Sequence, residues 1–413
     1  MRVLLRYAFQ ELPLNRVTLN VFEYNPRAVR SYEKAGFRVE GRVRGGLNRD
    51  GKRYDMIYMG ILRAEWEALQ GLPAAGDQRR LPHGFTDRPA AIEDIDAIVQ
   101  AINAWSRELT GGSDLKPEDL RQQFEIPVFH LERDTRVVVD PAGEIAGYWE
   151  LWDTSDPHVV MNAWGIVQPR CSGLGIGAYL IDWAEQRARS AIHLAPPDAQ
   201  VSLHAYLRSN DVRSRRRYRD AGYEHIRNSL RMLIDLNEAP PEPVMPDGIQ
   251  IRAMRPGVDD EAMTHAVRES FRDHWGFVER PFQDDLDRYR WEMAHDPHFK
   301  PELYLLAWDG DQIAGISLCS DYFDEDEAMG WVSTLGVCRE WRKRGLGLAL
   351  LQQSFVELYR HGKARIGLGV DAESLTGATR LYLKAGMRPD PLHEFHLYHK
   401  TLRPGKDLST QSV

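Results

Sequence analysis

The chain has 413 residues, of which 43% are hydrophobic and 28% charged, as is ordinary for a globular protein. This length exceeds one ordinary hydrophobic core, so we expect two to four domains. The formal net charge of −8 argues against a general nucleic-acid binder. No apolar run reaches the ~18 residues that a membrane-spanning helix needs. The three cysteines are scattered and lack metal-ligand spacing, so we predict a cytoplasmic protein without a metal site.

Residues 1–65, the first segment, contain only the back half of an α/β unit. The pattern predicts a helix over "LLRYAFQEL", a strand over "RVTLNVF", a helix over "NPRAVRSYEKAGF" and a closing hairpin that turns at "NRDG". A linker rich in glycine and proline follows at 66–84.

The rest of the chain repeats one plan twice, at 85–236 (the middle module) and 249–402 (the last module). A proline-rich linker separates them at 237–248, and 403–413 form a tail. Each module has a hairpin, a strand that runs into a glycine-rich turn and helix, another strand, and a helix that ends in glycine. Corresponding glycines are offset by a nearly constant interval: Gly147 and Gly315, Gly177 and Gly347, Gly222 and Gly386. We therefore predict a duplicated α/β domain.

The strongest chemical signal is "VCREWRKRGLG", from Val337 to Gly347, between an apolar strand and an apolar helix. Glycines allow the backbone to curl tightly, and the N–H groups at the helix start then point at one spot, where the helix dipole favours anions. Basic side chains add mobile positive charge there. This turn, here called the cradle, predicts a pyrophosphate site. It is not an ATP or GTP loop, because no G-x-x-x-x-G-K-[ST] is present, and the dinucleotide fingerprint fits poorly.

A tyrosine stands four residues before each helix-ending glycine, at Tyr32, Tyr218 and Tyr382. Glycine at that place suits the left-handed conformation that closes a helix. Taken alone, such a tyrosine is most simply a core residue with a wet hydroxyl group. Beside a cradle in the same module, a phenol that acts as general acid becomes the better interpretation.

The order of cradle, strand and tyrosine helix resembles the GNAT superfamily of acyl-CoA-dependent N-acyltransferases, whose two central motifs match residues 331–387. The tandem arrangement over 85–402 is similar to that of the mycothiol synthase family. The first segment, through "YDMIYMGILRAEWEAL", resembles the C-terminal half of ribosomal-protein N-terminal acetyltransferases. The resemblance implies tandem α/β (α+β) folds, each a mixed, mostly antiparallel sheet flanked by helices.

The resemblance also implies roles in the last module, with acetyl-CoA as the acyl donor. The backbone of the strand before the cradle would hold the pantetheine arm and polarise the thioester, and Tyr382 would protonate the departing thiolate. The base that deprotonates the amine is expected to be a carboxylate, but the strand "GWVSTLGV" has none, so Glu327 or Asp326 are the substitutes. The predicted cofactor contacts are Leu335, Gly336 and Val337 on the strand and Arg342, Lys343, Arg344, Gly345, Leu346 and Gly347 in the cradle.

The middle module departs from this pattern, because Ser172 and Leu174 stand where the last module has Arg342 and Arg344. We expect its fold to persist with a weaker hold on phosphate, and Arg170 is a candidate to compensate. The basic run "RSRRRYR" (213–219) is either a solvated helix face or a phosphate contact. The corresponding site residues are Ile166, Val167, Gly173, Gly175, Gly177 and Asn210, with Tyr218 as the acid.

The sequence thus predicts transfer of an acetyl group from acetyl-CoA to a primary amine of a small molecule or peptide, mainly in the last module. A non-catalytic acyl-CoA sensor or scaffold is the alternative, and a nucleotide-binding regulator is a more distant one. The stretch 268–291 mixes aromatic and acidic residues, which suits a cationic amine but equally an amphipathic core helix. Without a cradle, the first segment should not catalyse alone. Its strand edge needs cover, from another module, from upstream sequence or from a second chain in a homodimer.

Overall fold

The computed structural model describes residues 4–5, 8–9, 14–63, 65–66, 80–113, 115–154, 156–323, 326, 328–373 and 377–410. The helix expected over "LLRYAFQEL" falls mostly outside these residues. None of the described helices is long and apolar enough to cross a membrane. Within the same residues there is no group of three or more histidine, cysteine or acidic side chains that could hold a metal ion.

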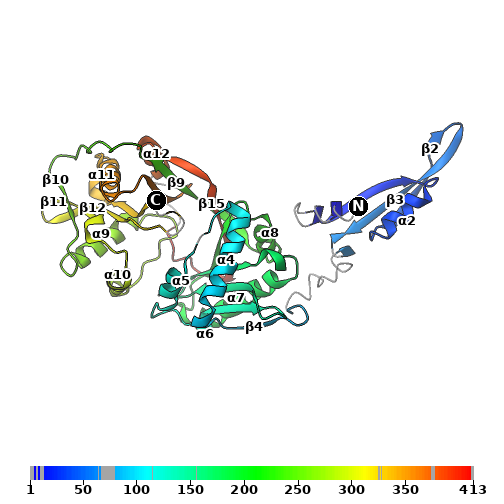
Figure 1. The fold of residues 1–413 in the computed structure, drawn as a ribbon, viewed down its shortest axis with the longest axis horizontal. Coiled ribbons are helices and arrows are strands. Elements are labelled where there is room, and N and C mark those ends of the chain that lie inside the picture. Colours follow the sequence, from blue (N-terminus) through cyan, green and yellow to red (C-terminus); the bar gives the residue numbers. More distant parts are fainter. Residues whose placement is uncertain are drawn as a thin grey trace.

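The first segment folds into a small antiparallel sheet with the order β1-β3-β2. Its elements are β1 (Arg16–Phe22), α2 (Pro26–Glu33), β2 (Arg38–Arg49) and β3 (Lys52–Leu62). The predicted hairpin is confirmed: Asp50 and Gly51 join β2 to β3 with φ values of 54° and 76°, as a tight primed turn requires. Figure 1 shows this sheet apart from the other two modules.

The middle module follows the predicted plan, with helices on both sides of its strands. Its elements are β4 (Thr86–Arg88), η2 (Ile92–Asp94), α4 (Ile95–Thr110), α5 (Pro117–Phe124), α6 (Leu131–Asp134), β5 (Thr135–Val139), β6 (Ile145–Trp152), β7 (Val160–Val167), η3 (Pro169–Cys171), α7 (Ile176–Ala191), η4 (Ile192–Leu194), β8 (Val201–Arg208), α8 (Val212–Asp220) and β9 (Glu224–Asp235). Helix α7 packs in one hydrophobic cluster, and α4 and α5 pack in another.

The last module repeats that order of elements. They are β10 (Ile249–Ala253), α9 (Asp260–Phe271), α10 (Phe282–His295), η5 (Pro301–Leu303), β11 (Tyr304–Asp309), β12 (Gln312–Ser320), β13 (Met329–Val337), η6 (Arg339–Trp341), α11 (Leu346–Arg360), β14 (Arg365–Asp371), α12 (Ala378–Lys384) and β15 (Arg388–Arg403). The glycines that close α2, α8 and α12 have φ values of 101°, 83° and 92° at Gly36, Gly222 and Gly386, which confirms the predicted left-handed helix ends.

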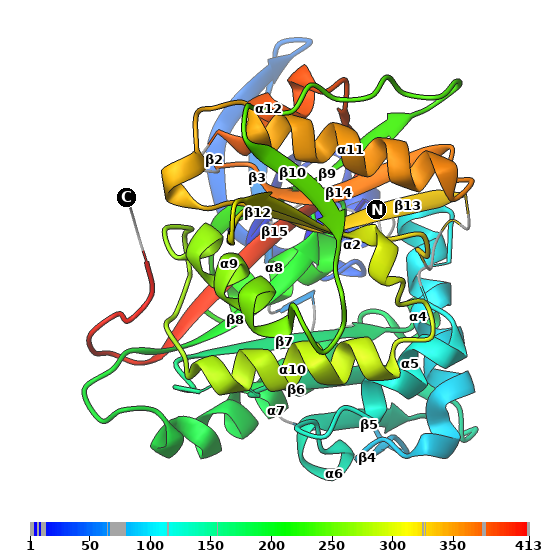
Figure 2. The same cartoon turned by 90° about the vertical axis from the view of Figure 1, so that its left-hand side faces the viewer.

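Both modules share one sheet of 12 strands, ordered β10-β11-β12-β13-β14-β9-β15-β8-β7-β6-β5-β4. The sheet is mixed and mostly antiparallel, as expected, with parallel pairs at β7–β8 and β13–β14. The sequence did not reveal that the modules exchange strands: β9 of the middle module pairs with β14, and β15 of the last module pairs with β8. In Figure 2, β15 runs between the strands of the two modules.

The number of strands that follow the tyrosine helix, here called the closing strands, accounts for this exchange. After its tyrosine helix, the first segment has two strands, β2 and β3, and β3 lies between β1 and β2. The middle and last modules each have one strand at that place, β9 or β15. Each module therefore completes its sheet with the closing strand of the other, which covers two strand edges at once.

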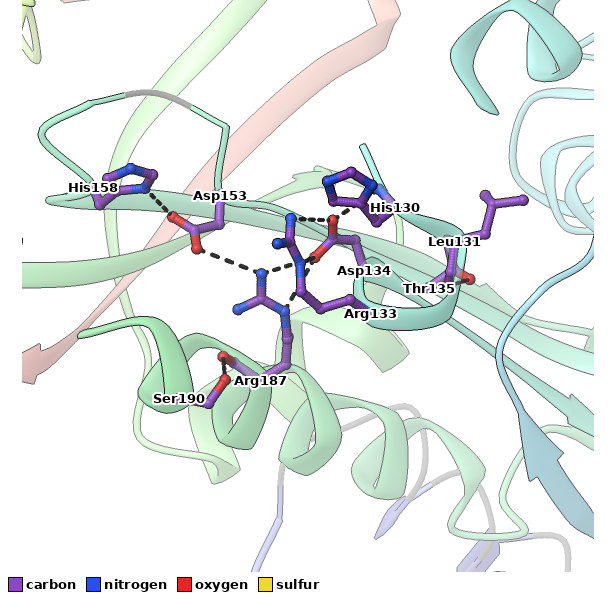
Figure 3. A network of polar contacts seen from close by, with 9 residues as sticks. All are labelled: His130, Leu131, Arg133, Asp134, Thr135, Asp153, His158, Arg187 and Ser190. Atoms are coloured by element: carbon purple, nitrogen blue, oxygen red, sulfur yellow. Dashed lines mark hydrogen bonds and ion pairs between the residues drawn. The ribbon is translucent and has the colours of Figure 1, made fainter. Parts of the chain in front are cut away.

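A buried ion network fixes one wall of the middle module (Figure 3). Arg187 on α7 donates to Asp134 at the end of α6 (Nη2 to Oδ1, 2.8 Å) and to Asp153 after β6 (Nη2 to Oδ2, 3.5 Å). Asp153 also contacts the imidazole of His158 at 2.7 Å. Burial by itself would raise the pKa of Asp134, but hydrogen bonds from Arg133, from the His130 N–H and from Arg187 lower it below its usual range. The network ties a helix, the end of a strand and His158 together.

Candidate active site

In the last module, two neighbouring strands of the sheet separate next to the cradle. Strands β13 and β14 pair in parallel only where Met329–Val332 of β13 lies beside Arg365–Leu368 of β14. Beyond Val332 the two strands separate. The separation begins at a β-bulge: Cys319 on β12 pairs with Val332 and Leu318 pairs with Thr334, which leaves Ser333 as the extra residue. From Ser333 to Val337, β13 therefore has no paired strand on its β14 side. The predicted contacts Leu335, Gly336 and Val337 lie on this edge.

The cradle follows directly and ends at α11. Gly345 stands before the helix with φ of 87° and Lys343 has φ of 62°, so the chain curls through two left-handed residues. Among the described residues, the backbone N–H groups from Lys343 to Gly347 meet no hydrogen-bond acceptor. Five free donors at a helix start, where the dipole is positive, fit a pyrophosphate.

The structure divides the three predicted cradle cations into two kinds. The Arg342 guanidinium is bound by protein: it pairs with both carboxylate oxygens of Asp273 and donates to the Ser270 carbonyl oxygen at 2.9 Å. It also donates to the Val337 carbonyl oxygen at 3.0 Å. Arg342 thus ties α9 to the cradle. In the described part of the chain, Lys343 and Arg344 have no ion-pair partner, and they remain the cations that an anion could meet.

Tyr382 lies on α12, beside the same opening. Its side chain packs in a cluster with Val332 of β13 and Leu368 of β14, and its residue is 8% exposed. Burial raises the pKa of Tyr382 to about 12, so its hydroxyl group keeps its proton at neutral pH. A protonated phenol at this place can act as a proton donor.

Tyr218, the corresponding tyrosine of the middle module, is placed differently. It is 1% exposed and enclosed by the rings of Trp149, Tyr223 and Tyr398, with centroid distances of 6.3, 4.8 and 6.3 Å. Burial raises its pKa well above the usual value. This environment is that of a core residue.

The middle module keeps the cradle backbone but not the bulge. Gly173 and Gly175 have φ values of 84° and 86°, and among the described residues the N–H groups from Gly173 to Gly177 likewise meet no acceptor. Strand β7 carries Ile166 and Val167 and separates from β8 beyond Asn162. Its pairing with β6 runs without a register shift. The offset changes by two positions, from 168 between Gly147 and Gly315 to 170 between Gly177 and Gly347, and the bulge accounts for one of the two.

Two residues that were predicted to contact the cofactor in the middle module are bonded to other parts of the protein instead. Asn210 donates from Nδ2 to the Leu109 carbonyl oxygen at 2.9 Å, which ties it to the end of α4. Arg170 pairs with Asp140 and donates to the side chain of Gln168 at 2.9 Å. The side chain of Arg170 is thus bound to the β5–β6 turn.

The described carboxylates do not support the base expected before β13. Glu327 lies outside the described residues. Asp326 accepts a hydrogen bond of 3.1 Å from Arg365, the first residue of β14, so it lies at the paired end of the two strands. Asp371, the last residue of β14, lies at the open end. Sequence reasoning missed Asp371, although its place at the end of the second parallel strand was visible.

A cavity of about 430 Å³ lies where the two modules meet over the exchanged strands. This volume is in the range of small-molecule sites. Trp275, in the loop after α9, stacks on His204 of β8 at 6.3 Å, and the Arg227 guanidinium lies 4.7 Å from the Trp275 ring centroid. The polar lining is mixed in charge and includes Asp156, Asn162, Tyr206, Arg227, Asn228 and Asp371.

Each of the two modules thus has an open strand pair, a cradle and a tyrosine helix. The model of the Acetyltransferase (GNAT) family matches residues 98–223 and 263–387, one match in each module. The chain belongs to this family. It is an acyl-CoA-dependent N-acetyltransferase that transfers acetyl from acetyl-CoA to an amine.

The chain is similar to two mycothiol acetyltransferases and to an N-acetyltransferase of known structure. The mycothiol acetyltransferase of Geodermatophilus obscurus is 32% identical over 311 residues, which cover 71% of this chain and 94% of that protein. The mycothiol acetyltransferase of Catenulispora acidiphila is 31% identical over 252 residues, 60% of this chain and 76% of that protein. The crystal structure of a GCN5-related N-acetyltransferase from Sphaerobacter thermophilus matches with a TM-score of 0.67 and 35% identity, and covers 81% of this chain and 100% of its own.

A further solved structure supports the fold alone. A tandem GNAT protein from the clavulanic acid biosynthesis pathway is 14% identical, with a TM-score of 0.60, and covers 78% of this chain and 100% of its own. The family matches lie within the middle and last modules, so the resemblance of the first segment to ribosomal-protein acetyltransferases stays a prediction.

Proposed function

We propose that acetyl transfer takes place in the last module and that its acceptor is a small polar amine bound in the cavity between the modules. The observation that carries this proposal is the β-bulge at Ser333, because it lies where β13 separates from β14 ahead of the cradle, whereas β7 separates from β8 without a bulge. Bulges are frequent next to active sites, where they redirect the backbone. The middle module has an unshifted register at the corresponding strands.

The last module supplies the groups that the reaction needs. Acetyl-CoA, when bound, supplies an acetyl thioester that an unprotonated amine attacks. The free N–H groups of the cradle, with Lys343 and Arg344, would hold the pyrophosphate, and the β13 backbone from Leu335 to Val337 would hold the arm and the carbonyl oxygen. Tyr382 would give its hydroxyl proton to the sulfur as the C–S bond breaks, and the proton that the nitrogen loses on forming the amide would replace it.

Asp371 is the group we propose to position the amine. Its carboxylate lies at the open end of β14 and lines the cavity, so an ammonium group there would have a negative partner. One of its oxygens already accepts from Arg227 at 2.7 Å and the other from the Glu373 N–H at 2.9 Å, which fixes its orientation. A carboxylate oxygen has more than one lone pair, so the carboxylate can accept a further donor.

Two observations support the proposed acceptor: the size and lining of the cavity, and the activity named for the similar proteins. A 430 Å³ cavity lined by a tryptophan and by acidic, amide and basic groups suits a small polyfunctional molecule better than a protein surface. Because the relatives are mycothiol acetyltransferases, we propose an amine related to mycothiol. The non-catalytic sensor is not favoured, since the family and these relatives are enzymes.

The test measures thiol release from acetyl-CoA with mycothiol lacking its acetyl group, with simple polyamines and with peptides that have a free N-terminus. We expect the first to have the highest kcat/KM. The variant Asp371→Asn should raise KM for the amine at least ten-fold while CoA binding stays unchanged, and Asp326→Asn, at the paired end of the strands, is the matched control. Equal kcat/KM for all three acceptors, or an unchanged KM in Asp371→Asn, would overturn the assigned acceptor site.

A further inference from the structure

The loop between α9 and α10 of the last module, residues 272–281, forms one wall of the cavity. Five of its residues line the cavity: Trp275, Gly276, Phe277, Val278 and Arg280. The Trp275 ring lies against His204 and Arg227, which both belong to the middle module. From 272 to 281 the chain is described throughout and forms turns and one β-bridge, without a helix or strand of its own. A loop of this kind keeps one conformation only when other parts of the protein hold it.

Thr410, in the segment after β15, holds this loop through three hydrogen bonds. Its backbone N–H donates to the Phe277 carbonyl oxygen at 2.8 Å, and its own carbonyl oxygen accepts from the Gly276 N–H at 2.8 Å. Its hydroxyl group donates to the Arg272 carbonyl oxygen at 3.1 Å. The bonds lie on both sides of Trp275 in the sequence, so they fix the part of the loop that places the indole ring in the cavity wall.

The same segment, residues 404–410 and here called the strap, is anchored on the middle module. The Lys406 N–H donates to the Asp198 carbonyl oxygen at 2.8 Å, and the Lys406 carbonyl oxygen accepts from the Gln200 N–H at 2.8 Å. Leu408 packs against the hydrophobic cluster that contains α7 and β8. The strap therefore joins the loop of the last module to the core of the middle module.

Gly405 allows the strap to lie this close to the middle module. A Cβ atom added to Gly405 would stand 2.5 Å from the Asp198 carbonyl oxygen and 2.6 Å from the Ala199 carbonyl carbon. Both are backbone atoms, which cannot turn aside as the end of a flexible side chain can. A larger residue at position 405 would therefore lift the strap without changing any group that lines the cavity.

We propose that the strap is a positioning element for the acceptor amine, because it holds Trp275 in the cavity wall before the amine arrives. A wall that had to be ordered at each binding event would lower the affinity. The cradle keeps a separate link to α9, since Arg342 donates to the Ser270 carbonyl oxygen at 2.9 Å. The strap therefore acts on the amine and not on acetyl-CoA. This inference rests on the proposed function, in which the cavity holds the acceptor.

The test measures steady-state kinetics of the full chain, with acetyl-CoA varied and with the best acceptor of the panel above varied. Gly405→Val should raise KM for the amine about ten-fold, because the wall is no longer ordered in advance. The kcat and the KM for acetyl-CoA should stay close to their wild-type values. Gly41→Val on β2 is the matched control, since a Cβ there meets nothing within 4 Å, and it should change none of the three constants.

A second variant and a second measurement keep the inference testable if Gly405→Val folds poorly. Thr410→Pro removes the N–H and the hydroxyl group that hold the loop, and leaves the bonds of Lys406 in place. It should raise KM for the amine in the same way. Hydrogen exchange of the Gly276 amide, followed by mass spectrometry, should be faster in both variants than in the wild type. Unchanged exchange would show that the strap does not hold the loop, and the inference would be wrong.

Asp371→Asn separates this inference from the proposed function. If Asp371→Asn raises KM for the amine and the two strap variants do not, the inference is wrong while the assigned acceptor site stands. If none of the three variants raises KM for the amine, the acceptor site itself is wrong and the inference falls with it. A rise in all three, with an unchanged KM for acetyl-CoA in the strap variants, supports both.

Discussion

Arg227 donates from Nε to Asp371 at 2.7 Å, and this bond joins the two modules. Arg227 lies on β9, which continues from the tyrosine helix of the middle module, whereas Asp371 ends β14 of the last module. The pair lies beside the cavity, so the strand exchange places a middle-module guanidinium against the carboxylate that we assign to the amine. In the proposed function, the site of one module is therefore completed by the other.

Because the exchanged strands interlock, the modules should stay together after the chain between them is cut. The linker 237–248 is irregular and Val244 is 90% exposed, so a protease site can be inserted there. We expect the cut fragments to elute together in size-exclusion chromatography and to separate only in denaturant. Separation under native conditions would contradict the exchange of β9 and β15.

Replacing Tyr382 with phenylalanine should lower kcat about 10²-fold or more, because the proton donor for the sulfur is removed. The thermal midpoint should change little, since the ring remains in its cluster. Tyr218→Phe is the matched control and should keep wild-type kcat, because that hydroxyl group is enclosed in the core. Unchanged turnover in Tyr382→Phe would remove the acid role.

Replacing Arg187 with methionine should destabilise the protein by about 3 kcal/mol, because two buried carboxylates, Asp134 and Asp153, lose a shared cation. Urea unfolding followed by circular dichroism measures this loss. Arg189→Met on the same helix is the control, since its side chain is 49% exposed. Asp156, two residues before His158 of this network, lines the cavity, so KM for the amine should rise in Arg187→Met but not in the control.

His204 should make stability depend on pH. Burial, and then the neighbouring His399, lower the pKa of His204 to about 4, below the ~6.5 of an unfolded histidine. Between these values the unfolded chain binds more protons, so stability is full above about pH 6.5 and is lost as the pH falls towards 4. We expect a loss of about 2–3 kcal/mol across this window in urea unfolding.

The variant His204→Phe keeps a ring beside Trp275 and should flatten this part of the pH profile. His193→Gln, an exposed histidine on η4, should leave the profile unchanged. An equally steep profile in His204→Phe would show that other groups, such as His396 or His399, carry the dependence.

Much of the last module could be predicted from its sequence. The glycines and basic residues from Arg342 to Gly347 indicated a pyrophosphate turn because backbone curl and helix dipole are local properties, and Gly345 and Lys343 are indeed left-handed. The role of the Arg342 side chain could not be predicted, since its partner Asp273 is 69 positions away and reaches it only through the packing of α9.

The sequence by itself determined the repeat, the turns, the helix ends and the family, because these depend on glycine, proline and side-chain patterns over a few neighbouring residues. Only the tertiary structure decided which strand lies beside which. A closing strand offers the same hydrogen-bonding groups to either module, so nothing local in β9 or β15 specifies its partner. That choice created the cavity and paired Arg227 with Asp371.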